Sequence, residues 1–262
     1  MKLTAIALLL LTSTPVLAHS DSDCDINING DLEYTPSLLT LTHSNGDIVT
    51  ISDDHELTIN REAVSLTARQ QEWVAGYYDS ISEAVPLTMN LASDALALAN
   101  SALTETFGKL LGEDDELIQD FQAAFKDMRT ELKQKFESED GHFKITRNDT
   151  DESGWTGQAW ASKFEQRIED LAERATGRIL MSLGTQMFSG DESMEDFGER
   201  MEAFGEDLEQ RMEGQADALE TKAEDLCKIL YQADNYENKL QDNIAGLDQF
   251  NMLNVKSDSS KM

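Results

Sequence analysis

The longest regular alternation of apolar and polar positions covers residues 191–247. Apolar residues recur there at steps of three and four, with two successive four-residue steps between Leu208 and Ala216. This spacing is typical of a heptad seam with one stutter, so it predicts one long helix. The seam consists of Met194, Phe197, Met201, Phe204, Leu208, Met212, Ala216, Leu219, Ala223, Leu226, Leu230, Ala233, Leu240, Ile244 and Leu247. A seam of this length packs against another helix of the chain or against a partner.

Helical patterns also fill the middle of the chain. Thr67 followed by Gln70 forms a capping box, which predicts a helix start. Pro86 is expected to end or kink that helix. Further helices are expected at residues 87–111, from the acidic residues 113–116 onward, and at 158–188. Gly190 predicts a reversal that makes residues 158–188 and the last helix an antiparallel pair.

Short alternating runs before residue 67 predict strands instead of helices. Ile26 and Ile28 alternate with polar residues ahead of Asn29-Gly30, and a similar run precedes Asn45-Gly46. Both Asn-Gly pairs are strong hairpin signals, so this region predicts an antiparallel β-meander. Each strand carries few apolar residues, so the meander must lie on the helices. A further brief strand is expected at residues 142–146.

These elements predict an α+β fold that is mainly helical. An N-terminal antiparallel β-meander packs on long amphipathic helices, which end in an antiparallel helical pair. The expected organisation is a signal peptide at residues 1–18, the meander at 19–66, a helical region at 67–250 that forms one domain with it, and a disordered tail at 251–262.

The first residues have the pattern of an export signal. Lys2 precedes a short apolar core, and a run of small residues ends at Ala18. The apolar core is shorter than the roughly 20 residues that span a bilayer. We expect cleavage after Ala18 and a periplasmic location, without acylation because Cys24 does not directly follow the cleavage point.

The two cysteines and the charge balance narrow the chemistry further. Cys24 and Cys227 in an exported chain favour one disulfide, and closing so long a loop is worth about 4–5 kcal/mol. The chain has 51 acidic and 21 basic residues. Nucleic acid and anionic membrane surfaces would be repelled, so neither is expected as a partner. The acidic excess reflects solvated helix faces or an attraction for cations or basic segments of other proteins.

No motif in the sequence predicts catalysis, a metal site or a cofactor. Asp25, Asn27 and Asn29 match half of a calcium loop, but Pro36 stands where its glutamate should be. His19 would need a second histidine to hold copper. The hypothesis of a cation-binding acidic protein depends on residues 113–116 and 149–152.

A hydrolase is a further alternative, because a few acid–base pairs are present. It would be built around His55-Glu56 or Asp53-Asp54, which lie in an expected turn. A Gly-x-Ser-x-Gly element and a phosphate-binding glycine loop are both absent.

A stripe of flexible apolar side chains opens the last helix. It consists of Met194, Phe197, Met201, Phe204 and Met212. Methionine is flexible and polarizable, so such a stripe suits varied apolar partners. Two interpretations remain: the stripe packs inside the protein against residues 160–187, or it binds a partner.

Several short matches resemble a known family. A cysteine-led strand at residues 24–30, a helix opening at 66–71 with Tyr77-Tyr78, and a late cysteine at Cys227 are similar to the YggN family of bacterial periplasmic proteins. That family has no established activity, so the resemblance implies localisation and architecture only. The hypothesis is a non-catalytic protein that contacts periplasmic or envelope proteins, in a chaperone-like or envelope-maintenance role. The sequence leaves the oligomeric state open.

Overall fold

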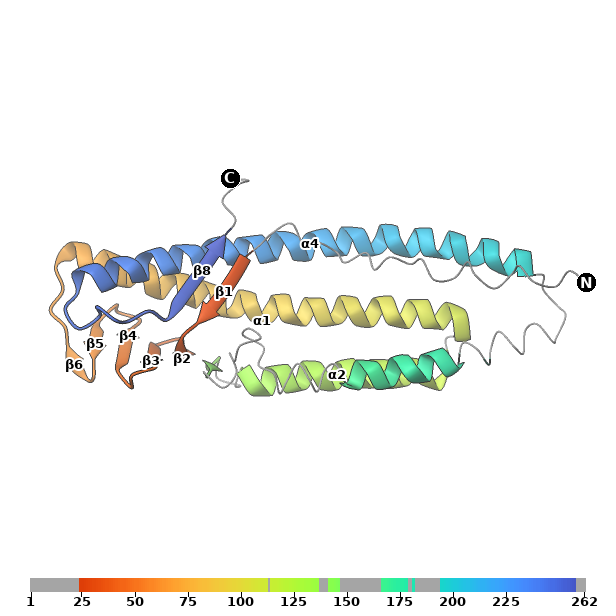
Figure 1. The fold of residues 1–262 in the computed structure, drawn as a ribbon, viewed down its shortest axis with the longest axis horizontal. Helices are drawn as coiled ribbons and strands as arrows, with labels where there is room; N and C mark the ends of the chain where they lie inside the picture. The colour runs from red at the N-terminus through yellow and green to blue at the C-terminus, as the bar shows by residue number, and fades with distance from the viewer. Residues whose placement is uncertain are drawn as a thin grey trace, which may run out of the picture.

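The computed structural model describes residues 24–112, 114–136, 141–146, 166–178, 181 and 194–257. Long helices run along the molecule, and short strands gather at one end (Figure 1). The predicted fold class, mainly helical α+β with an N-terminal antiparallel sheet, is confirmed. The signal segment and cleavage point at residues 1–18 lie outside the described residues.

The strand end is built on one antiparallel sheet of six strands. Its order is β6-β5-β4-β3-β2-β7. The strands are β2 (Gly30–Thr35), β3 (Leu38–His43), β4 (Ile48–Ser52), β5 (Leu57–Ile59), β6 (Glu62–Ala63) and β7 (Phe143–Ile145). Leu39, Leu41, Val49 and Ile51 lie on one face and are almost completely buried, as expected of a meander packed on helices. β7 is the brief strand predicted near residue 143, and it extends the sheet beyond β2.

A second sheet joins the two ends of the described chain. β1 (Cys24–Ile28) pairs antiparallel with β8 (Leu253–Ser257), with Ile26 opposite Val255. The expected disordered tail at 251–262 is therefore wrong for residues 253–257. Leu253 and Val255 are buried, and the apolar contacts they gain offset the entropy of ordering this stretch. We call this two-stranded sheet the β1–β8 ribbon.

Asn29-Gly30 is not the hairpin turn that the sequence predicts. The chain crosses there from the β1–β8 ribbon to the large sheet, because β1 pairs with β8 and β2 pairs with β3. Gly30 has φ +151°, and a Cβ there would collide with the carbonyl oxygen of Thr42 and the side chain of Met252. The glycine therefore permits a close approach of backbone segments.

α1 (Ala68–Leu111) begins with the predicted capping box. The Thr67 side chain accepts a hydrogen bond from the Gln70 backbone amide, and the Gln70 side chain accepts one from the Thr67 amide. Of the two expectations for Pro86, the end of the helix is wrong, because α1 continues through this residue. A proline in a helix removes one backbone hydrogen bond. Apolar packing of α1 on both sides of Pro86, from Ile81 to Met89, outweighs that loss.

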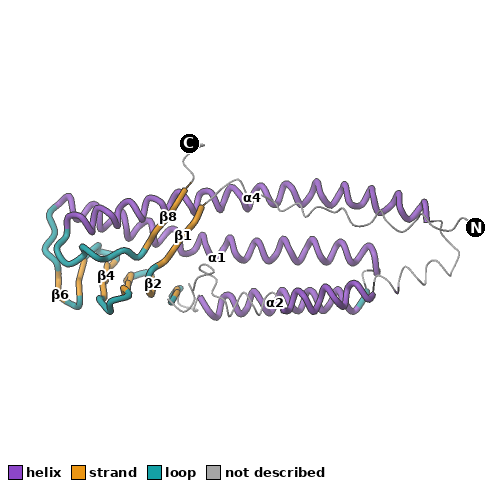
Figure 2. The backbone as a smooth tube through the Cα atoms, viewed as in Figure 1, coloured by secondary structure: helices purple, strands orange, loops and turns teal. Residues whose placement is uncertain are grey.

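Three helical segments pack side by side with α1 or with α2 (Glu116–Phe136). α4 (Met194–Asn243) lies antiparallel along α1, and α2 returns along α1 on another side (Figure 1). Residues 166–178 are helical and lie against α2 through the ion pairs Arg167–Glu131 at 2.7 Å, Arg178–Asp115 at 3.1 Å, and Arg174–Asp120. Figure 2 shows that helix dominates the long axis and that strands occur only near one end of the part that is described.

α4 packs along α1 in the part of the chain that the structure describes. More than half of residues 158–188, which Gly190 predicted as a partner of the last helix, lies outside that part. That pairing stays a prediction.

Gly76 provides a test of the α1–α4 packing. A Cβ at Gly76 would lie within 3.0 Å of three ring carbons of Tyr236 on α4. We expect Gly76→Ala to destabilise the protein by about 1–3 kcal/mol through overpacking. Gly214→Ala is the matched control, because a Cβ at Gly214 meets nothing within 4 Å, and should stabilise α4 by about 0.5–1 kcal/mol. Urea unfolding of both variants measures the difference, and equal effects would contradict this packing.

Candidate functional site

The α1–α4 pair changes character along its length. Near the sheets, the α4 seam is buried at Leu226, Ala233 and Leu240. Toward the other end, residues 202–225 of α4, all within the described ranges, contain no buried side chain. Six seam residues lie in this stretch. Ala216 is exposed, and the other five are half-buried: Phe204, Leu208, Met212, Leu219 and Ala223. The apolar pattern therefore continues beyond the point where the described residues cover it.

α1 behaves in the same way over this stretch. Beyond Leu96, the only buried position of this helix, which is described throughout, is Gly108. We call the stretch formed by residues 97–111 of α1 and 202–225 of α4 the distal limb. Half-buried apolar side chains on two neighbouring helices leave contact area that a further molecule can use.

A cleft of about 620 Å³ opens in the distal limb beside α2, and we call it the distal cleft. It is lined by Thr104, Glu105, Gly108, Lys109, Ile118, Gln122, Phe204, Asp207 and Arg211. Its volume lies within the range of small-molecule and side-chain binding pockets. The lining combines apolar groups with charged ones, so the cleft suits a ligand that carries both.

Arg211 organises the charged side of the distal cleft. Its guanidinium lies 2.7 Å from the Glu105 carboxylate on α1 and 3.0 Å from the Asp207 carboxylate on α4. These side chains are between one-third and two-thirds exposed, so solvent screens the pairs and they stabilise the fold little. Their effect is to hold the Arg211 side chain across the gap between the two helices.

One polar atom in the lining has no partner among the described residues. The hydroxyl oxygen of Thr104 is buried and makes no hydrogen bond to them. An unpaired buried hydroxyl is unfavourable.

The predicted stripe is placed only in part. Phe204 lines the distal cleft, and Met212 is half-buried on the same helix. The side chains of Met194, Phe197 and Met201 lie outside what the structure describes. Half of residues 160–187 does too, so core packing and partner binding both stay predictions for those three.

Sequence reasoning missed the charged residues of the cleft. Asp207 and Arg211 are four residues apart on one helix, which is a visible pairing signal. Glu105 comes from α1, and only the tertiary structure brings it to Arg211.

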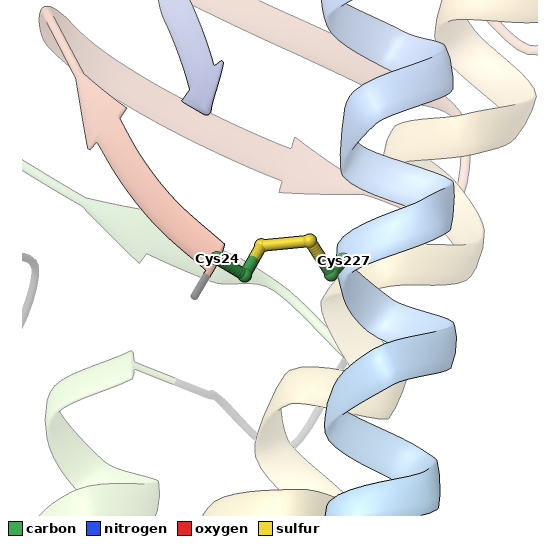
Figure 3. Close-up of a disulfide and its surroundings, with 2 residues drawn as sticks. All are labelled: Cys24 and Cys227. Carbon is green, nitrogen blue, oxygen red and sulfur yellow. A yellow bond between two sulfur atoms is a disulfide. The ribbon is translucent and has the colours of Figure 1, made fainter. Parts of the chain in front are cut away.

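The predicted disulfide is present between Cys24 and Cys227 (Figure 3). It joins the start of β1 to the middle of α4, with a Cα–Cα distance of 6.1 Å. The bridge therefore fastens the β1–β8 ribbon to the helical pair, at the boundary between the buried part of the α4 seam and the distal limb.

A buried carboxyl group, Glu237, lies under the ribbon and has no exposed surface. The Tyr77 hydroxyl donates to one of its oxygens at 2.8 Å. The backbone amides of Met252 and Leu253 donate to the other at 2.6 and 3.1 Å. Burial raises the pKa of Glu237 from 4.5 to about 8, although these three donors act in the opposite direction. Glu237 thus anchors the start of β8 to α4.

Asp234 supports the same strand one helical turn away. Burial raises the pKa of its carboxyl group, and the hydrogen bond from the Val255 amide lowers it. The outer amides of β8 therefore find acceptors on α4. The sequence carried one signal of this buried carboxyl group. The apolar seam skips from Ala233 to Leu240, and Glu237 occupies the seam position between them.

A small apolar cavity also lies under the ribbon, with a volume of about 50 Å³. Ile26, Ile28, Leu226, Leu230 and Leu253 are among its lining residues. One water needs about 10–15 Å³ of such space, so the cavity has room for a few atoms and not for an acyl chain.

The acid–base candidates form a weak arrangement. His55 lies 3.3 Å from Asp79, and their side chains are 29% and 68% exposed. Glu56 shapes the turn through its amide, which donates to the Ser52 hydroxyl, and the Asp53 amide donates to the Ser37 carbonyl. Both side chains are open to solvent, which screens the interaction between them.

The metal candidates that lie in the described ranges are not brought together. Over the described residues, no group of three or more His, Cys, Asp or Glu side chains is placed to hold an ion. Asp115 and Glu116 pair with Arg178. Asp25 and Asn27 lie in β1 and pair with β8, so this segment is the strand that the alternation of Ile26 and Ile28 predicted. His19, Glu113 and residues 149–152 lie outside the described ranges.

Comparison with known proteins gives a family for this fold. A family model described as "Protein of unknown function (DUF2884)" matches residues 24–253. The chain belongs to this family. The DUF2884 match begins at the disulfide cysteine of β1 and ends at the first residue of β8. No curated protein and no solved structure matches the chain. None of the helices in the described ranges is both long and apolar enough to cross a membrane.

Proposed function

We propose that the chain is an exported periplasmic protein of the YggN-like kind, which acts without catalysis through contacts with other envelope proteins. The distal cleft is its contact site. The observation that carries this proposal is the half-buried apolar seam of the distal limb beside a cleft of about 620 Å³.

The seam supports binding because its apolar pattern continues into the distal limb, where the rest of the protein covers its side chains less completely. Leu226, Ala233 and Leu240 are buried against the rest of the protein, whereas Phe204 and Met212 keep part of their surface in solvent. Partly exposed apolar residues at regular spacing are typical of a surface that a partner covers. Flexible methionine suits a chaperone-like binder that accepts several partners.

Export is supported by two separate features. Residues 1–18 have the pattern of a cleaved signal, and the Cys24–Cys227 disulfide persists best in an oxidising compartment. The disulfide fastens the sheet end of the helical pair, and the distal limb then extends a partly exposed surface away from the core.

Photo-crosslinking in living cells tests the proposed contact site. A benzophenone amino acid replaces Phe204 in one version and Tyr231 in a matched version, since Tyr231 is an aromatic residue on α4 that is 41% exposed but lies nearer the sheets. After irradiation of the cells, we expect discrete protein adducts from position 204 and not from position 231. Absence of adducts at 204, or the same adducts at both positions, would count against the proposal.

A further inference from the structure

We propose that the segment received by the distal cleft is basic and amphipathic, with an apolar anchor beside Phe204 and lysine or arginine side chains against α4. This inference rests on the proposed function and adds the chemistry of the partner. It is carried by the charge balance of the distal limb together with the mixed lining of the cleft.

The distal limb has a large acidic excess on α4. Residues 202–225 contain nine acidic residues and two basic ones, Arg211 and Lys222. Both basic residues are already paired within the protein. Arg211 contacts Glu105 and Asp207, and Lys222 lies 2.6 Å from Asp94 on α1.

Most of the remaining acidic side chains have solvent around them. Glu202, Glu206, Glu209, Glu213 and Glu220 are exposed. Side chains at these helical spacings spread over the surface of α4, and they do not form the compact cluster that a metal ion needs. A polypeptide with cations at similar spacing matches this distribution better.

The cleft adds an apolar requirement to this charge requirement. Phe204 and Ile118 supply apolar surface within it, so an aliphatic or aromatic side chain gains by entering. A purely basic segment would leave this surface uncovered. An acidic segment would be repelled by the glutamates of α4. A basic amphipathic segment meets both the apolar requirement and the charge requirement, as a helix does when its apolar face lies in a groove.

Defined peptides provide the test. The probe is a synthetic amphipathic peptide of about 18 residues, about 27 Å as a helix, with leucine and phenylalanine on one face and lysine on the other. One matched peptide replaces every lysine by glutamate. Another keeps the lysines and replaces the apolar face by serine. Fluorescence anisotropy with the oxidised mature protein should show binding of the probe and at least about tenfold weaker binding of both matched peptides.

Variants of the protein locate the interaction. Phe204→Ala should weaken binding of the probe by about tenfold, as expected for loss of an aromatic anchor. Tyr231→Ala should leave binding unchanged. Glu206→Gln combined with Glu209→Gln should reduce the dependence of affinity on salt, because fewer charges are screened. Circular dichroism of each variant verifies that the helices remain folded.

The outcomes separate this inference from the proposed function. Equal binding of the acidic peptide, no binding of the probe, or binding unaffected by Phe204→Ala would each overturn the basic amphipathic partner. If crosslinks still form at position 204 in cells, the contact site stands with a partner of different chemistry. If neither peptide binding nor crosslinking is observed, both proposals fail.

Discussion

Glu237→Gln should remove most of the fall in stability that the wild-type protein shows as the pH rises from about 5 to 8. The pKa of Glu237 is raised from 4.5 to about 8 by burial. Between those two values the folded state binds a proton that the unfolded state has released, so the free energy of unfolding decreases as the pH rises. Below the pKa of Glu237 in the unfolded state, both states bind the proton, so the free energy of unfolding no longer depends on this group. With 1.36 kcal/mol for each pKa unit, the full effect is on the order of several kcal/mol.

Glutamine preserves the local hydrogen bonds without the charge. Its carbonyl can accept from the amides of Met252 and Leu253, and its NH₂ group can donate to the Tyr77 hydroxyl. The variant should therefore match wild type near pH 5 and exceed its stability near pH 9 by a few kcal/mol.

Urea unfolding at several pH values measures this difference. Asp242→Asn is the control, because Asp242 lies on the same helix, α4, but is exposed. It also replaces one carboxylate by an amide, so it accounts for the general repulsion within an acidic protein. Asp234 also titrates near Glu237, and its contribution should remain in the Glu237→Gln curve. Parallel pH curves for wild type and Glu237→Gln would contradict a neutral buried carboxyl group.

The parts of this fold that the sequence predicted depend on local signals. Thr67 and Gln70 satisfy each other three residues apart, and α1 begins where they predict. Asn45-Gly46 connects β3 to β4 as expected, with Gly46 at φ +92°. Apolar alternation predicted β3 and β4, because one face of each strand is buried. In each case the residues that decide the conformation are neighbours in the chain.

The errors involve pairing between distant segments. The residues of β8 have only a short apolar alternation, and their partner β1 lies more than 200 residues earlier. Neither strand identifies the other by its own pattern. Glu237 illustrates the same limit, because a glutamate on a helical seam is ordinarily exposed. Its burial depends on Tyr77 and on the backbone of Met252, which come from other elements.

Only the apolar part of the candidate site could be predicted from the sequence. The apolar periodicity of one helix is enough to place Phe204 in the stripe, so the sequence alone predicts this residue of the site. The pairing of Arg211 with Glu105 depends on the packing of α1 against α4. Continuation of α1 through Pro86 has the same cause, since a local rule predicts a break and tertiary packing outweighs it.

Removal of the Cys24–Cys227 disulfide should produce the largest loss of stability by substitution. The bridge closes a loop with a sequence separation of 203. In the chain-entropy model, such a loop restricts the unfolded state by about 5 kcal/mol. We expect the Cys24→Ala/Cys227→Ala double variant to lose much of its folding free energy and to unfold at a lower urea concentration.

The loss should be concentrated at the β1–β8 ribbon in the folded protein. Hydrogen exchange should become faster in β1 and β8, while the amides of β3 and β4 keep their protection, because the large sheet has its own buried face. Wild-type protein unfolded with and without a reductant provides the control for the alanine side chains. The reduced protein should resemble the double variant. If both unfold at the same urea concentration as the oxidised protein, the bridge does not restrict the unfolded chain, and Glu237 with Asp234 must supply the main attachment of the ribbon to α4.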